Sequence, residues 1–176
     1  MKRHSNRYNV TSALLALLCV LCVQAHAQQP SHALQAALAS SAASADSADA
    51  AIPAAQLLQP AELVQILRSA GGHKPLILQV GSHVLFAEAH IPGSEYAGAG
   101  GEDSGLQALR DRVKDVKRDQ FLVLYCGCCP WSRCPNIRPA YQQLRALGFT
   151  QVKVLYLADN FGANWVDKGY PVAKGR

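Results

Sequence analysis

The sequence has few aromatic and few charged residues: aromatic side chains make up 7% of its 176 positions, and Asp, Glu, Lys and Arg make up 16%. No stretch combines a basic stripe with interleaved aromatic residues, which argues against a nucleic acid as partner. A second apolar run comparable to Val10–Val23 is also missing, so we expect no membrane-spanning helix after that point. The glycines of Gly98–Gly101 do not follow a strand-like run, which argues against a phosphate-cradling loop.

The amino terminus, residues 1–27, is predicted to be a signal peptide. Three basic residues precede the apolar segment Val10–Val23, and Ala25-His26-Ala27 has the small-x-small form of a cleavage site. Cleavage removes Cys19 and Cys22 with the segment and lowers the formal net charge from +5 to about +2. We therefore expect an exported protein, periplasmic or secreted, with no membrane attachment once the signal is cleaved; the alternative is an uncleaved anchor.

Residues 28–54 are predicted to form a disordered linker. They are rich in Ala, Ser and Gln and contain no aromatic residue, so they cannot bury enough apolar surface to offset the entropy of ordering. The folded domain is predicted over residues 55–176, a length that suits one domain.

Within this domain, apolar runs typical of strands alternate with segments of helical periodicity. The turn His90–Ser94 and the glycine-rich loop Tyr96–Gly105 separate the two halves. This alternation predicts an α/β fold with a central, mostly parallel sheet and helices on both faces. The expected helices are 60–71, 83–89, 106–116, a segment starting between Pro135 and Pro139 and ending at Leu147, and 162–168; the expected strands are 76–80, 121–125 and 151–157.

Four cysteines lie in the loop after the apolar strand 121–125: Cys126, Cys128, Cys129 and Cys134. Ligands of parallel sheets bind beyond the carboxyl ends of strands, where Cys126 is placed, and a thiol near a helix N-terminus tends to ionise. Three interpretations of the other thiols remain open. They are resolving thiols, with Cys126-x-x-Cys129 at redox spacing; they form a loop disulfide, the favoured state in an oxidising compartment; or they bind Zn or Cu(I). Clustering within nine residues argues against a structural zinc site, and we predict no metal.

Five segments, taken in order, resemble the rhodanese-like family: PLILQV, AHIPGSEY, FLVLYC, LRALGFTQVKVLYL and NWVDKGYPV. The resemblance covers about Leu57 to Val172. The resemblance implies a single small α/β domain whose cysteine after the central strand carries a sulfane sulfur as a persulfide. That residue corresponds to Cys126. The loop that would bind the substrate then comprises Gly127, Cys128, Cys129, Trp131, Ser132 and Arg133, and Trp165 and Tyr170 match the carboxyl-terminal packing positions of the family.

The chain departs from the family pattern at several positions. The family's Asp and Arg on the preceding strand are replaced by Gln79 and Gly81, and two prolines in the loop remove backbone donors. Phosphatases of this fold use Cys-x5-Arg, but Arg133 follows Cys126 after six intervening residues, which argues against a phosphatase. Arg133 and Arg138 are candidates for binding an anionic donor.

The sequence therefore predicts a sulfurtransferase that moves a sulfane sulfur from a thiosulfate-like anion to a thiol or cyanide through Cys126. No cofactor is expected, and the protein is expected to be a monomer. One alternative is a thiol–disulfide oxidoreductase that pairs Cys126 with Cys129 or Cys128. The other is a non-catalytic module of the same fold that binds a metal or a protein partner.

Overall fold

The structure is a computed structural model, and it describes residues 51–71 and 74–175, which all belong to one compact unit, Ala45–Arg176. The predicted signal peptide, residues 28–50 of the predicted linker, and His73 lie outside the described residues. Inside those two ranges, no helix combines the length and the apolar character that crossing a bilayer requires.

A five-stranded, fully parallel sheet forms the centre of the unit, in the order β1-β5-β4-β2-β3. The central strand is β4, Leu122–Tyr125, and all four of its residues are buried, as expected for a strand covered on both faces. Its neighbours are β2, Leu76–Gln79, and β5, Val152–Leu155. The predicted α/β class is confirmed.

The two outer strands, β1 (Leu57–Leu58) and β3 (Glu95–Tyr96), were not predicted from the sequence. Each has only two residues, which are too few to show a periodic pattern of apolar side chains. Each forms because it pairs with the edge of a longer strand. Glu95 pairs with Leu78 and Leu57 pairs with Val154, so their register depends on distant segments. Tyr96 therefore ends a strand rather than beginning the predicted loop.

In the described part of the chain, four α-helices surround the sheet: α3 (Pro60–Arg68), α4 (His83–Glu88), α5 (Asp103–Val113) and α6 (Ile137–Ala146). The α3 helix starts with Pro60 at its first position, and the Glu62 carboxylate accepts a hydrogen bond from the Gln59 N–H. The α5 helix begins three residues before the predicted Leu106. Gly148, with φ of +86°, ends the last turn after α6, as predicted.

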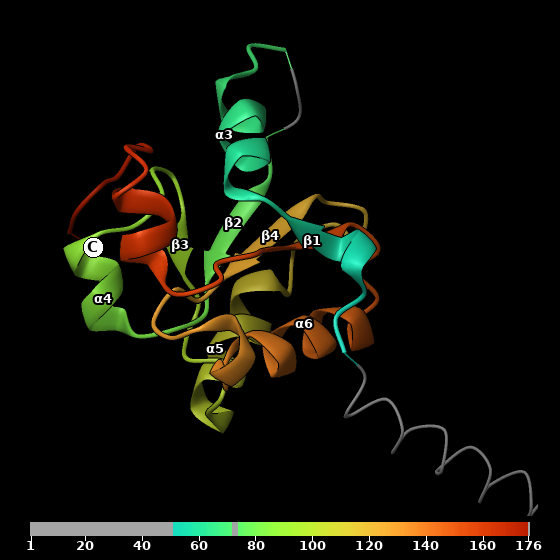
Figure 1. Ribbon diagram of the computed structural model, residues 1–176. Coiled ribbons are helices and arrows are strands. Elements are labelled where there is room, and N and C mark those ends of the chain that lie inside the picture. The colour runs from blue at the N-terminus through green and yellow to red at the C-terminus, as the bar shows by residue number, and fades with distance from the viewer. Residues whose placement is uncertain (1–50, 72–73, 176) are drawn as a thin grey trace, which may run out of the picture. The chain divides into compact units, whose positions relative to one another are not determined.

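Two separate apolar cores lie on the two faces of the sheet (Figure 1). Helices α5 and α6 cover one face, where Leu109 and Leu144 pack against Leu124. On the other face, α3 and the carboxyl-terminal segment pack against Val123 and Leu155. Helices on both faces are therefore confirmed, and β4 contributes side chains to both cores.

The carboxyl-terminal segment is anchored by Trp165, which lies in a short π-helix, Gly162–Val166, in place of the predicted 162–168 helix. Its side chain is fully buried, and its indole N–H donates to the Pro171 carbonyl at 2.8 Å. From there the chain pairs Ala173 with His90 in the predicted turn. This path brings Phe161 and Val166 to the carboxyl end of β4.

Candidate active site

Cys126 follows β4 directly, and its side chain is buried, with 6% of its surface exposed. Gly127 then turns the chain with a φ of +77°, a backbone region that residues with side chains rarely adopt. A Cβ atom at Gly127 would also lie 2.7 Å from the Cβ of Phe161, and the Phe161 N–H donates to the Gly127 carbonyl at 2.9 Å. Glycine is therefore required here to bring the cysteine loop against the carboxyl-terminal segment.

Gln79 and Gly81, which replace the family's Asp and Arg, form the support beneath Cys126. The Gln79 amide donates to the Cys126 carbonyl at 3.1 Å and accepts from the Gly81 N–H at 3.1 Å. A Cβ atom at Gly81 would lie 2.9 Å from the Cys126 sulfur. A neutral amide thus bridges the ends of β2 and β4, and the small residue leaves room for the sulfur.

The Sγ of Cys128 lies 3.0 Å from that of Cys126, and the Sγ of Cys129 lies 3.4 Å from that of Cys128. The Asn136 amide donates to the sulfurs of Cys126 and Cys128 at 3.4 and 3.6 Å. Asn136 is buried, and its carbonyl oxygen accepts from the Gly101 N–H at 2.8 Å, which fixes the amide with its N–H₂ group toward the sulfurs. Sequence reasoning missed this role; the signal was a polar residue at the start of the helix that follows the cysteine loop.

Cys134 is the thiol that ionises most readily. The Cys126 S–H donates to it, and the backbone N–H groups of Asn136 and Ile137 at the start of α6 also donate, which lowers the pKa of Cys134 to about 6. The hydrogen bond to Cys134 and burial together raise the pKa of Cys126 above its ordinary range. Burial raises the pKa of Cys129 to about 12, so this thiol stays neutral. When the Cys126–Cys134 pair loses one proton, the negative charge therefore lies on Cys134.

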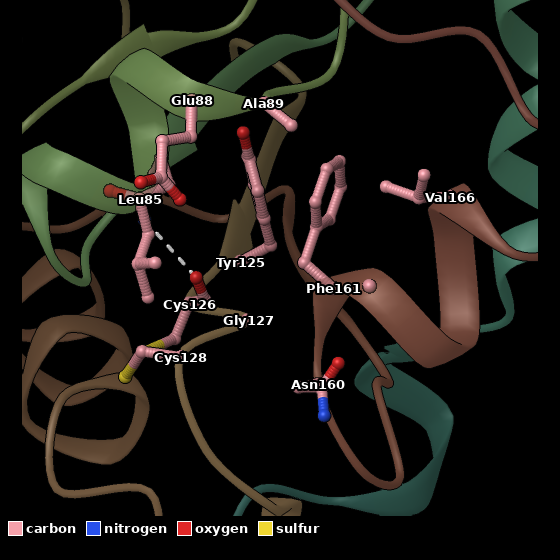
Figure 2. A pocket seen from close by; sticks show the side chains of 12 residues that line it. Leu85, Glu88, Ala89, Tyr125, Cys126, Gly127, Cys128, Asn160, Phe161 and Val166 are labelled. Atoms are coloured by element: carbon pink, nitrogen blue, oxygen red, sulfur yellow. Dashed lines mark hydrogen bonds between the residues drawn. The ribbon is translucent and has the colours of Figure 1, made fainter.

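A cavity of about 370 Å³ opens beside Cys126. Figure 2 shows Cys126 and Cys128 on one side of it, with Phe161 and Val166 across from them. Leu85 and Ala89 add further apolar surface, and Glu88 is the charged side chain of the lining. No Lys, Arg or His from the described ranges lines it. The cavity therefore suits a small molecule with an apolar body.

The predicted loop residues Trp131, Ser132 and Arg133 form a short 3₁₀ turn that does not line this cavity. The Trp131 ring centroid lies 5.1 Å from that of Tyr156, and the backbone N–H of Trp131 donates to the Ala158 carbonyl at 3.0 Å. Trp131 thus anchors the loop to the segment after β5. Ser132 and Arg133 are exposed. The structure thus brings Cys126, Gly127 and Cys128 together at the cavity. Trp131, Ser132 and Arg133 lie away from it.

The four cysteines of the described residues are free thiols, so the predicted loop disulfide is not formed in this structure. The sulfurs of Cys126, Cys128 and Cys129 all lie within 4.8 Å of one another. No other described group of His, Cys, Asp or Glu side chains is gathered closely enough to share an ion. Three soft sulfur donors suit Cu(I) better than zinc, which usually takes four ligands in structural sites.

No family model matches the sequence, and no curated protein does either. Among solved structures, the rhodanese-like domain of the Alr3790 protein from Anabaena sp. aligns with a TM-score of 0.52 and 19% identity, over 68% of this chain and 79% of that one. The BH2092 protein from Bacillus halodurans aligns with a TM-score of 0.52 and 20% identity, over 66% of this chain and 75% of that one.

A third structure, a protein from Rhodopseudomonas palustris described as a possible tyrosine phosphatase, aligns with a TM-score of 0.50 and 19% identity, over 73% of this chain and 89% of that one. At these identities the similarity is one of fold. The chain therefore has the fold of the rhodanese-like domains to which it aligns.

Proposed function

We propose that the protein is a sulfurtransferase that carries a sulfane sulfur on Cys126. The observation that carries this proposal is the position of the Cys126 thiol, which closes the central strand, faces a cavity and donates its proton to an ionised neighbour, Cys134. A nucleophile hydrogen-bonded to a base is the arrangement that activates a thiol.

Cys134 acts as the base in the first half-reaction. As the Cys126 sulfur bonds to the sulfane sulfur of the donor, its proton passes to Cys134. The sulfur–sulfur bond of the donor breaks, and the leaving group departs with the electron pair. With thiosulfate, the products are a Cys126 persulfide and sulfite, so atoms and charge balance without an external oxidant. In the second half-reaction, an acceptor thiolate takes the outer sulfur and Cys126 leaves as a thiolate.

The persulfide anion has donors around it. The Cys128 backbone N–H and the Asn136 side-chain amide both donate to the Cys126 sulfur, and the first N–H groups of α6 lie behind Cys134. Hydrogen bonds to an anion favour the charged form, which keeps a persulfide ionised in a largely buried site.

The lining of the cavity supports a particular class of donor. Apolar side chains such as Leu85, Phe161 and Val166 surround it, and the one charged group among the described lining residues is the Glu88 carboxylate. A divalent anion such as thiosulfate meets no positive charge from these residues, whereas an organic persulfide can bury its apolar body. We therefore propose an organic persulfide as the preferred donor, in place of the small anion expected from the sequence.

The direct test is the intact mass of the reduced protein, measured after incubation with thiosulfate and, separately, with an alkyl persulfide. We expect a gain of one sulfur atom, faster with the persulfide, and no gain in Cys126→Ser. Circular dichroism of the variant controls for folding. A reduced wild-type protein that gains no sulfur from either donor contradicts the proposal.

A thiol–disulfide oxidoreductase is the second candidate, favoured by the 3.0 Å between the sulfurs of Cys126 and Cys128. Oxidation of this pair forms one sulfur–sulfur bond and passes two electrons and two protons to a disulfide partner. In the same mass experiment, this function would appear as a loss of two hydrogens on treatment with oxidised glutathione, reversed by reductant. Metal retained through purification would instead support a binding module.

We further propose that the protein acts after export, as a monomer in the periplasm or outside the cell. The support is the sequence pattern of residues 1–27. The mature chain isolated from the exported fraction should begin at Gln28, as read by amino-terminal sequencing, and should elute as a monomer. An intact Met1 end on the membrane-bound protein would contradict cleavage and favour an anchor.

A further inference from the structure

Cys128 lies between two cavities. It lines the apolar cavity together with Cys126, and it also lines a second one of about 480 Å³ to which Cys126 does not contribute. The second cavity is bounded by the start of α4, the end of β3 and the loop before α6. Cys129 and Cys134 line neither of these cavities. Of the four described thiols, Cys128 alone has access to both.

The two cavities differ in chemistry. The first is lined mainly by apolar side chains, whereas the second presents Ser82, His83, Tyr96 and Glu102, with Asn136 at its base. The second cavity therefore offers hydrogen-bond donors and acceptors and a carboxylate, which suit a polar thiol that carries an amino group. The two cavities thus offer separate surroundings for a donor and an acceptor, and the second is the more polar of the two.

We propose that the sulfane sulfur is relayed from Cys126 to Cys128 and leaves through the second cavity to a polar, amine-bearing thiol. This inference rests on the proposed persulfide of Cys126. With 3.0 Å between the Sγ atoms of Cys126 and Cys128, an outer sulfur bonded to Cys126 can reach Cys128 without any movement of the backbone. The relay spares the acceptor from reaching Cys126, which is buried.

The relay balances without an oxidant or reductant. The Cys128 thiol gives its proton to the ionised Cys126 persulfide, and the Cys128 sulfur bonds to the outer sulfur. The bond between Cys126 and that sulfur breaks, and Cys126 leaves as a thiolate. The acceptor thiolate then takes the outer sulfur from Cys128, which leaves as a thiolate in turn. Attack of Cys128 on the inner sulfur is the competing reaction, and it yields a Cys126–Cys128 disulfide and hydrosulfide.

Asn136 serves both positions of the relay. Its amide donates to the sulfurs of Cys126 and Cys128 at nearly equal distances, 3.4 and 3.6 Å. The same amide therefore stabilises a negative sulfur at either end of the relay. A sulfur that moves readily in both directions is required of an intermediate carrier.

The first experiment locates the persulfide. The wild-type protein is loaded with an alkyl persulfide, the sulfurs are capped by alkylation, and the peptide that contains Cys126 and Cys128 is sequenced by fragmentation mass spectrometry. We expect the extra sulfur on both cysteines in the wild type and on Cys126 alone in Cys128→Ser. The relay is overturned if the wild-type protein carries the extra sulfur on Cys126 alone, whatever the delay between loading and alkylation.

The second experiment measures the half-reactions separately, with cysteine as acceptor. Cys128→Ser should still load Cys126 but should transfer to cysteine on the order of a hundredfold more slowly than the wild type, because the acceptor must reach a buried sulfur. Cys129→Ser removes the adjacent thiol without opening either cavity, and its effect should be far smaller. Cys128→Ala serves as a second variant should the serine disturb folding.

Variants of the two cavities complete the test. Glu102→Gln should slow transfer to cysteine by about threefold to fivefold, as expected for one exposed ionic contact, and leave loading unchanged. Asp115→Asn, an exposed site on another part of the surface with the same charge change, should alter neither. If Cys128→Ser loads Cys126 and transfers sulfur to cysteine at the wild-type rate, the relay is overturned and the sulfurtransferase proposal stands. If Cys126 does not load in the wild type, both proposals are overturned.

Discussion

At the scale of single residues, the four thiols of one loop are placed in different surroundings. Cys126 faces the apolar cavity, Cys128 faces both cavities, Cys129 stays neutral, and Cys134 holds the negative charge at the start of α6. Their differences arise from burial and from the groups that donate to each sulfur, since the residue type is the same. The roles of the thiols are therefore separable by mutation.

The base role of Cys134 predicts a pH profile. Below pH 6, Cys134 is protonated and cannot accept the Cys126 proton, so the rate of persulfide formation should rise as the pH passes through about 6 and then level off. In Cys134→Ala the hydrogen bond that most raises the Cys126 pKa is lost and so is the base. Cys126 must then ionise by itself, and the midpoint should move to about pH 8.5 or above. Coincident profiles for the two proteins, measured by stopped-flow loading, would contradict this role.

Asn136 predicts a second effect at this scale. Asn136→Ala removes the amide that donates to two sulfurs, and loss of a hydrogen bond to an anion should slow loading by about tenfold. Asn136→Asp keeps an acceptor for the Gly101 N–H but places an acceptor beside the sulfurs, so it should slow loading further. If both variants load sulfur at the wild-type rate, Asn136 has no role in persulfide formation. Thermal unfolding of each variant separates this effect from a loss of structure.

At the scale of elements, the site depends on how closely the ends of β2 and β4 approach each other. The Gln79 amide bridges them, and Gly81 leaves the space that the Cys126 sulfur occupies. The turn after β4 then depends on Gly127, and the helix α6 supplies N–H groups from the far side of the loop. The reacting sulfur is thus held by three elements that are distant in the sequence.

Gly81→Ala tests this packing. The added methyl group would lie 2.9 Å from the Cys126 sulfur, so the variant should lose about 1–3 kcal/mol of unfolding free energy, as overpacked sites do, and should load more slowly. Gly71→Ala is the matched control, because a Cβ atom added at Gly71 would have no described atom within 4 Å. Urea unfolding measures both. Equal stability of the two variants would show that the end of β2 can move away from Cys126.

At the scale of the whole domain, the carboxyl-terminal segment closes the apolar cavity and joins it to the second core. Phe161 and Trp165 stack with 5.9 Å between ring centroids, and Trp165 is fully buried while Phe161 lines the cavity. The same segment pairs with His90, whose ring Nδ1–H donates to the Phe86 carbonyl and whose ring stacks on Phe86. The position of the cavity wall therefore depends on the packing of Trp165 and on the pairing with His90.

Trp165→Ala should consequently affect both stability and specificity. Removing a fully buried tryptophan should cost about 3–5 kcal/mol of unfolding free energy, and the loosened wall should reduce the preference for an alkyl persulfide over thiosulfate. Val172→Ala, in the same segment but 40% exposed, should change neither by much. Chemical unfolding and the ratio of the two loading rates are the measurements. An unchanged ratio in a folded Trp165→Ala protein would contradict a role for this wall in selecting the donor.

The sequence by itself determined the fold class, the central strand and the position of Cys126 at its end, because hydrophobic periodicity and turn residues act over a few neighbouring positions. Only the tertiary structure decided which groups surround that sulfur. The sulfur of Cys128 lies 3.0 Å from it, Trp131 packs away from the cavity, and the contact from Gln79 spans 47 positions in the chain. Such contacts follow from strand register and from the side to which a turn directs each side chain, which no local pattern of residues encodes.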